Sequence, residues 1–230
     1  MSDLSEAVRQ AGGMLAGKDP EVWRIAGLSV VLSLSATIAA SAAAVPFASS
    51  FAGARFPGHR LVRALFSAAM AFPTILVGLV LFALFSRQGP FGVLHLLYTP
   101  LLMGVGQFLL ALPVCLVLML AAIEAVDPRA RETALLLGAT VSQARRVVRR
   151  EARSGLVVAA VAAFSRVIAE VGCALVVGGD IRWRTRVLTT AIAGDTRSGD
   201  FSRALALGAI LLVVALAVSG AAALLPGRRR

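Results

Sequence analysis

The sequence is poor in the residues that build metal and redox sites. Its 230 residues include only two cysteines and two histidines. Cys115 and Cys173 lie within apolar runs and form no CxxC pair, so nothing indicates a disulfide framework or a redox motif. His59 and His95 lie in predicted loops, far apart and without the spacing of metal ligands. We therefore expect buried, inert thiols and no metal site.

Nucleotide-binding and secretion signals are missing as well. No GxxxxGK[ST] loop occurs, so any nucleotide site has to belong to a partner. Asp3, Glu6 and Arg9 precede the first long apolar run, which does not fit a cleaved signal peptide. We expect no enzyme activity and no cofactor in this chain.

Charged residues are scarce, at 15%, whereas hydrophobic residues make up 58%. This composition is too apolar for an ordinary soluble domain and predicts a membrane protein built as one bundle of helices. The net charge of +11 could suggest nucleic acid, but the arginines fall between apolar runs and form no basic face with interleaved aromatic residues. We therefore attribute the basic residues to membrane topology and expect no nucleic-acid partner.

Five apolar runs are long enough to cross a bilayer, for which a helix needs about 20 residues. The first is rich in Ser, Ala and Thr, which lets neighbouring helices pack closely. Pro73 and Pro113 should kink the second and third, and Gly178-Gly179 should end the fourth. The predicted spans are 25–47, 61–85, 99–123, 156–177 and 204–225.

Polar segments separate the predicted spans. Residues 1–24 form a polar, interfacial segment, with a short amphipathic helix over 1–20 that ends at Asp19-Pro20. Residues 54–60 should turn, and residues 86–97 and 180–203 should form loops. A basic tail, 226–230, follows the last span.

The basic residues are distributed unevenly between the two faces that five spans would create. Residues 49–63, 124–155 and 226–230 together carry 13 basic and four acidic groups, whereas the opposite side carries nine basic and seven acidic groups. Loops rich in Lys and Arg stay in the cytoplasm. We therefore predict that the N-terminus lies outside and that the C-terminus lies in the cytoplasm.

One strongly basic stretch, residues 127–153, lies between the third and fourth spans. Asp127 followed by Pro128 predicts a helix start, because the carboxylate accepts from free N–H groups and Pro loses no hydrogen bond there. Gly138 predicts a turn, and a second helix leads into the next span. Composition alone leaves two interpretations open: a docking surface for a soluble partner, or an interfacial loop among anionic headgroups. The arginines of the second helix are Arg145, Arg146, Arg149 and Arg150.

The residues around the turn favour the docking surface. Their pattern resembles the E-A-A---G motif of permease subunits of ABC importers, the cytoplasmic loop that docks into a groove on the ATPase. Thr replaces Ala at the second position, and Arg150 stands where many members have Pro. The resemblance implies an all-α membrane protein with five transmembrane helices of the type I ABC importer permease (MetI-like) fold and a cytoplasmic coupling helix. The ATPase-coupling residues that it implies are Glu132, Thr133, Ala134, Gly138 and Ala139.

Two further patterns indicate which subgroup of these permeases the chain resembles. Residues 164–172, FSRVIAEVG, resemble the F-x-R-x-x-x-E-x-G pattern of molybdate, sulfate and tungstate permeases. Residues 178–182, GGDIR, and 189–192, TTAI, are similar to the G-G-N-I-R and T-T-A-I of the tungstate branch. The start at residues 19–23, DPEVW, also looks like that branch. Asp180 stands where the branch has Asn and adds a negative charge.

This resemblance implies the function and the partners. The chain should be the permease of an ATP-driven importer in the cell (inner) membrane of a bacterium or archaeon, moving an oxyanion, most specifically tungstate, with molybdate or sulfate as alternatives. It should work as a homodimer among membrane lipids, with a cytoplasmic ABC ATPase dimer that binds ATP and Mg, and with a periplasmic or lipid-anchored oxyanion-binding protein. A self-contained secondary carrier or channel would need ionisable residues in several spans, and only one span has them.

Two sets of charged or polar residues could have either a structural role or a role in the passage of the anion. Arg166 and Glu170 lie four residues apart within the fourth span and can pair, either as a structural ion pair or as part of an anion pathway. Arg182, Arg184 and Arg186 could contact headgroups or form an electropositive mouth. The residues expected at a gate or entrance are Gly178, Gly179, Arg182, Arg186, Thr189 and Thr190.

Overall fold

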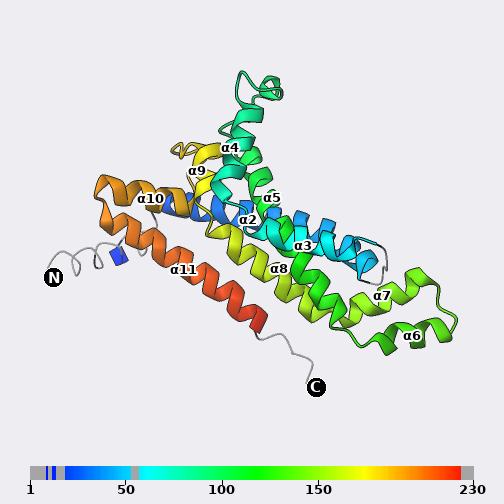
Figure 1. Cartoon of the computed structure of the whole chain (residues 1–230). Coiled ribbons are helices and arrows are strands. Elements are labelled where there is room, and N and C mark those ends of the chain that lie inside the picture. Colours follow the sequence, from blue (N-terminus) through cyan, green and yellow to red (C-terminus); the bar gives the residue numbers. More distant parts are fainter. Residues whose placement is uncertain (1–8, 10–11, 14–18, 53–56, 224–230) are drawn as a thin grey trace.

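The computed structural model is all-helical throughout the residues it describes, which are 9, 12–13, 19–52 and 57–223 (Figure 1). Most of the expected amphipathic helix over 1–20, the first residues of the turn at 54–60 and the whole basic tail at 226–230 lie outside them. The helices are α2 (Pro20–Phe51), α3 (His59–Met70), α4 (Thr74–Phe85), a 3₁₀ turn η1 (Gly92–Leu94), α5 (Pro100–Glu124), α6 (Pro128–Leu136), α7 (Val141–Glu151), α8 (Arg153–Ile168), α9 (Gly172–Gly178), α10 (Leu188–Ser198) and α11 (Phe201–Ala223).

Three of these helices, α2, α5 and α11, are each long and apolar enough to cross a membrane. Two bent pairs, α3 with α4 and α8 with α9, pass the same test when each pair is taken together. The described chain thus offers three to five candidate spans by length and composition, and the prediction of an all-α membrane fold is confirmed.

The second predicted span is not the kinked helix that the sequence suggested. α3 and α4 meet at an angle of 90°. Pro73 lies directly before α4 with extended backbone, where it removes an N–H donor and pushes the preceding residue out of the helical region. The helix therefore ends at Met70 and restarts at Thr74. Pro113, in contrast, lies inside α5, which continues through it.

The fourth predicted span is also broken, by 59° between α8 and α9. Its end is as predicted, because Gly179 caps α9 with φ +69. The break itself is held by Glu170, whose Oε1 accepts from the Cys173 amide at 3.0 Å in the first turn of α9. Since a side chain here satisfies the free N–H that a helix start leaves, the new direction of the chain is stabilised.

Small residues let the central helices approach closely. α2, α5 and α8 share a core in which alanines from each helix are fully or almost fully buried. α4 and α9 approach as closely, because a Cβ added at Gly78 would lie 3.0 Å from the Cys173 Cα. In lipid there is no hydrophobic driving force between helices, so close packing of this kind is what holds them together. The buried alanines are Ala40, Ala44, Ala48, Ala111, Ala159 and Ala163.

Two of the predicted polar segments contain helix that was not predicted. α2 begins at Pro20, five residues before the predicted span, because Asp19 caps it by accepting from the Glu21 amide at 2.8 Å. The predicted loop 180–203 contains α10, which packs on α11 and contacts α2. Asp19-Pro20 therefore starts a helix, as Asp127-Pro128 does.

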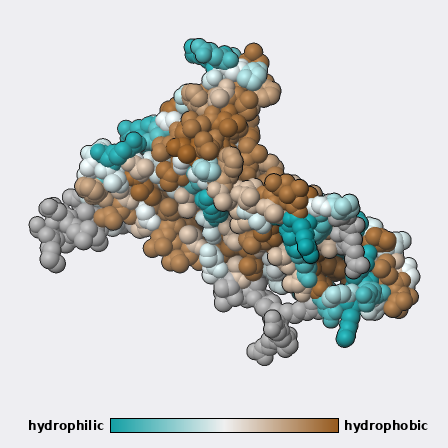
Figure 2. All heavy atoms as spheres, viewed as in Figure 1, coloured by the Kyte–Doolittle hydropathy of each residue, from teal (hydrophilic) through white to brown (hydrophobic). Residues whose placement is uncertain are grey.

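The polar residues gather away from the apolar middle of the molecule. Figure 2 shows hydrophilic side chains at the tip of the loop between α4 and α5 and around the α6–α7 end, with apolar atoms covering much of the surface between them. α6 and α7 project at one end of the molecule, remote from α10 (Figure 1).

Candidate functional site

The α6–α7 hairpin, residues 127–153, is built from helix caps that can be recognised in the sequence. Asp127 accepts from the Arg129 amide at 2.9 Å, as expected for the residue before Pro128. Thr140 and Gln143 form a reciprocal capping box at the start of α7. Each helix start is therefore satisfied by residues of the hairpin itself.

Gly138 ends α6 in a conformation that other residues rarely adopt, with φ +84. Its amide donates to the Leu135 carbonyl at 3.0 Å, and the Ala139 amide donates to the Ala134 carbonyl at 3.0 Å. This pair of bonds is a Schellman motif, which needs a left-handed residue after the helix. The predicted turn is confirmed, and its geometry explains why glycine stands at this position of the motif.

The hairpin presents an apolar tip beside charged groups. Leu136 is 88% exposed and Leu137 is 83% exposed. Glu132 and Thr133 are exposed too, whereas Ala134 is buried. Two leucines held in solvent at the end of a rigid turn are costly for a free surface and typical of a buried interface. The structure thus brings all five predicted coupling residues, 132–134 and 138–139, into one exposed hairpin.

Arg166 and Glu170 lie at the break between α8 and α9. The Arg166 Nη1 and the Glu170 Oε2 are 3.5 Å apart, so the predicted pairing is present. The two side chains differ in environment: that of Glu170 is 4% exposed and that of Arg166 is 48% exposed. Glu170 also caps α9, and a Cβ at Gly172 would lie 3.4 Å from both Glu170 Oε1 and Thr74 Oγ1 at the start of α4. The two helix breaks therefore meet at this pair.

Thr189 and Thr190 are buried and hold the start of α10 in place. Thr189 donates to the backbone carbonyl of Glu170 at 2.6 Å, and Thr190 accepts from the Val187 amide at 3.0 Å. From α2, Ser29 accepts from the Leu188 amide at 2.7 Å. Thr189 therefore joins α10 to the α8–α9 break, whereas Thr190 caps the start of α10, and both side chains are buried.

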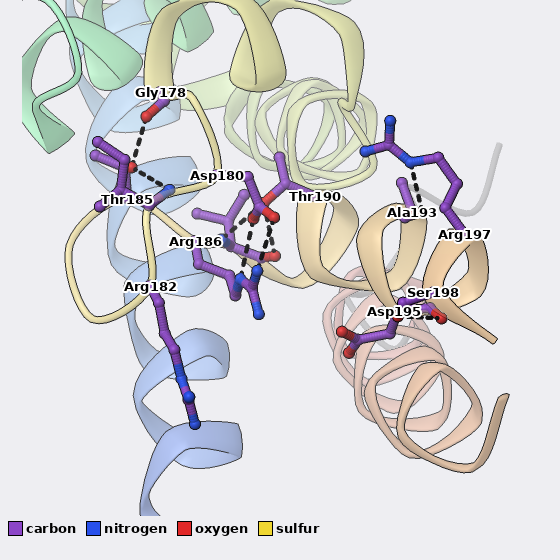
Figure 3. A network of polar contacts seen from close by, with 12 residues as sticks. Gly178, Asp180, Arg182, Thr185, Arg186, Thr190, Ala193, Asp195, Arg197 and Ser198 are labelled. Atoms are coloured by element: carbon purple, nitrogen blue, oxygen red, sulfur yellow. Dashed lines mark hydrogen bonds and ion pairs between the residues drawn. The ribbon is translucent and has the colours of Figure 1, made fainter. Parts of the chain in front are cut away.

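The loop between α9 and α10 is tightly closed on itself (Figure 3). Thr185 is fully buried and donates to the Gly178 carbonyl at 2.6 Å. Asp180 has a left-handed backbone, φ 49, and accepts two hydrogen bonds from Arg186, at 3.2 and 3.0 Å. Asn and Asp are the residues that best tolerate this backbone, so the exchange of one for the other is structurally mild. The negative charge of Asp180 is matched locally by Arg186.

A second ion-pair network ties this loop to α2. Arg182 donates to Glu21 through two nitrogens, at 2.9 and 2.6 Å, and Arg203 Nη2 lies 2.8 Å from Glu21 Oε2. Arg203 also reaches Asp195, at 3.4 Å. Glu21 is only 4% exposed. Sequence reasoning missed Glu21, Asp195 and Arg203, although the DPEVW start at residues 19–23 gave a signal for the first.

These contacts neutralise much of the charge expected at an electropositive mouth. Arg182 and Arg186 are paired with Glu21 and Asp180, and the hydrogen bonds that Arg182 donates to Glu21 raise the pKa of its guanidinium. Arg184 is exposed. Burial raises the pKa of Asp195, against the opposing effect of Arg203. A group with such a raised pKa favours the folded state most at low pH and loses that contribution as the pH rises through the raised value.

Comparison with known proteins places the chain among transporters. Residues 44–230 match the family described as binding-protein-dependent transport system inner membrane component. The tungstate uptake system permease protein TupB of Peptoclostridium acidaminophilum is 38% identical over 220 residues, which is 95% of this chain and 96% of the relative.

Two further relatives are more varied. A probable anion ABC transporter permease protein of Haloferax volcanii is 39% identical over 200 residues, 85% of this chain and 86% of the relative. The sulfate transport system permease protein CysT of Salmonella typhimurium is 31% identical over 169 residues, 70% of this chain and 61% of the relative. With its bundle of apolar helices and exposed α6–α7 hairpin, the chain belongs to the inner membrane component family of binding-protein-dependent transport systems.

Proposed function

We propose that this chain is the permease of an ATP-driven oxyanion importer and that its substrate is tungstate. The observation that carries this proposal is the similarity to a tungstate uptake permease along nearly the full length of both chains. The similarity to sulfate permeases is weaker and covers less of each protein, which makes sulfate the second candidate. Molybdate has the same charge and tetrahedral shape and stays an alternative.

Uptake of labelled anions tests the substrate. Cells that lack this chain and its partner proteins should regain tungstate uptake when all components are restored together. Molybdate and sulfate, each at the same concentration, should compete poorly. An ATPase variant that cannot hydrolyse ATP should abolish uptake, because the chain has no nucleotide-binding loop of its own. Uptake that persists without hydrolysis would support a secondary carrier, and preferential sulfate uptake would replace tungstate by the second candidate.

The α6–α7 hairpin is the contact with the ATPase in this proposal. Two copies of the chain form a homodimer, each hairpin docks on one subunit of an ATPase dimer, and an oxyanion-binding protein delivers substrate at the opposite face. This arrangement puts the N-terminus outside and the C-terminus in the cytoplasm. ATP binding draws the two hairpins together, and the packed helices transmit that movement as rigid bodies. The exposed Leu136 and Leu137 support this assignment, because docking would bury them.

Arg166 lies on the anion pathway in this proposal, and Glu170 positions it. A half-exposed arginine inside a candidate span supports a pathway role, because an ionisable group at membrane depth faces a cavity or a partner. Glu170 is also bound by the Cys173 amide, so the α8–α9 break does not depend on Arg166 alone. The Gly178–Gly179 turn and the closed loop that follows form the outer edge of the same region.

Replacing Arg166 by Gln should lower tungstate uptake about tenfold, which corresponds to about 1.4 kcal/mol of lost stabilisation of the anion in transit. Assembly with the ATPase should be unchanged, as measured by co-purification. Arg166→Lys keeps the charge and serves as the control, with most of the uptake retained. Normal uptake by the Gln variant would leave the pair with a structural role only.

A further inference from the structure

A cavity of about 290 Å³ lies where the α6–α7 hairpin joins the helix bundle. It is bounded by the C-terminal ends of α2 and α5 and by the facing sides of α6 and α7. Its polar lining consists mainly of Ser50, Glu124, Asp127, Arg131, Arg145 and Arg149. None of these residues belongs to the exposed tip that carries Leu136 and Leu137, so the cavity lies at the base of the hairpin, away from that tip.

The lining carries an excess of positive charge. Glu124 is paired with Arg63, and Asp127 is engaged in capping α6. Arg145 donates to the Ser50 hydroxyl at 3.5 Å, and within the described ranges none of the three lining arginines forms an ion pair. The three guanidinium groups outnumber the two carboxylates of the lining, and one of these, Glu124, is already paired with Arg63, so the cavity suits an anion with several oxygens.

The position of the cavity relative to the membrane indicates which kind of anion it binds. α2 and α5 are two of the candidate spans, and the cavity lies beside their ends, at Ser50 and Glu124. Polar groups at the end of a span lie at the level of the lipid headgroups. Basic pockets between helices at this level bind the phosphates of anionic lipids.

We propose that this cavity binds a phosphate group between Arg131, Arg145 and Arg149, and that an anionic phospholipid headgroup is its source. The phosphate oxygens accept from the guanidinium groups of α6 and α7, while the Ser50 end of α2 closes one side. A bound headgroup joins the hairpin to the membrane face at the point where the hairpin leaves the bundle. The lipid thereby holds the hairpin at a fixed angle to α2 and α5.

The test compares two double variants on the same helix. Arg145→Gln with Arg149→Gln removes two cavity arginines. Arg146→Gln with Arg150→Gln removes the same charge from positions outside the cavity. The full chain, purified in detergent, is titrated with phosphatidylglycerol or with zwitterionic phosphatidylcholine, and retained lipid is counted by native mass spectrometry. Phosphatidylglycerol affinity should fall about tenfold in the cavity variant, since each arginine near the membrane contributes several-fold.

A second arm separates the two sources of phosphate. Inorganic phosphate is added to lipid-depleted protein, and the shift in melting temperature is recorded. One outcome is that inorganic phosphate, and not phosphatidylglycerol, raises the melting temperature of the wild-type protein, with no such rise in the cavity variant. That result would keep the phosphate site and assign it to a free anion. Equal loss of binding in both double variants, or no loss in the cavity variant, would overturn the proposal. Arg131→Gln, on the other helix, repeats the test if the double variant fails to fold.

Discussion

Replacing Gly138 by Val should abolish co-purification of the ATPase while leaving membrane insertion intact. Gly138 has φ +84, and a left-handed backbone costs an ordinary residue about 1–2 kcal/mol, with more for a β-branched one. The Schellman bonds at the end of α6 would break, and the direction of the Leu136–Leu137 tip would change. Because Gly138 is exposed and the turn between α6 and α7 lies at the end of the hairpin away from the bundle (Figure 1), the spans should fold normally. Pull-down of the ATPase from solubilised membranes measures the loss.

Gly199→Val is a closely matched control for this experiment. Gly199 also has φ +84 and also caps a helix, and a Cβ added at either glycine would meet no atom within 4 Å. It lies after α10, remote from the hairpin. The strain is therefore similar, but the ATPase should still co-purify. Retained ATPase binding by the Gly138 variant would remove the hairpin from the proposed interface.

Replacing Glu21 by Gln should destabilise the protein by about 2 kcal/mol, the cost of weakening the charge-assisted hydrogen bonds to a buried carboxylate. The cost stays below that of a fully buried pair, because the Arg182 side chain is 61% exposed and keeps its contact with water. Glu21 is buried and forms ion pairs with Arg182 and Arg203, which lie in two different parts of the chain. Without its charge, the α9–α10 loop and the start of α11 lose one attachment to α2, whereas the hydrogen bonds of Arg24 to the Trp183 carbonyl and of the Leu188 amide to Ser29 remain. Thermal unfolding of the purified protein in detergent measures the effect.

Glu124→Gln provides the comparison. Glu124 pairs with Arg63, but both side chains are partly exposed, and exposed ion pairs contribute about 0–1 kcal/mol. The Glu124 variant should therefore unfold close to the wild-type temperature. If the Glu21 variant is equally stable, the buried network is not what attaches the loop to α2.

The two proposed functional regions differ in how they are held together. The hairpin depends on caps and a glycine turn that operate within a few residues. The region around Arg166 and Glu170 depends on contacts between α4, α8, α9 and α10, which are distant in sequence. Local damage should therefore disable coupling without unfolding the bundle, whereas damage at Glu170 or Thr189 should disturb several helices at once.

The local signals of the hairpin were sufficient for prediction from sequence. Asp127 caps α6 through its own carboxylate, and Pro128 and Gly138 act through their own backbone geometry, so the helix start and the turn at residues 127–138 follow from residue type. The apolar runs likewise predicted a membrane protein, because length and hydropathy are properties of the chain itself. The motif around Glu132 and the patterns at residues 164–192 pointed to the family that the comparisons then showed.

Only the tertiary structure determined the angles at the helix breaks and the counter-ions of the arginines. Pro73 is compatible with a kink or with a right angle, and only the packing of α4 against α9 selects 90°. Arg182 and Arg186 look like free positive charge in the sequence, but Glu21 and Asp180 neutralise them through contacts across 161 residues in one case and six in the other. Hydropathy and local propensity describe a residue and its near neighbours, so they cannot assign a charge to a distant counter-ion or an angle to a break.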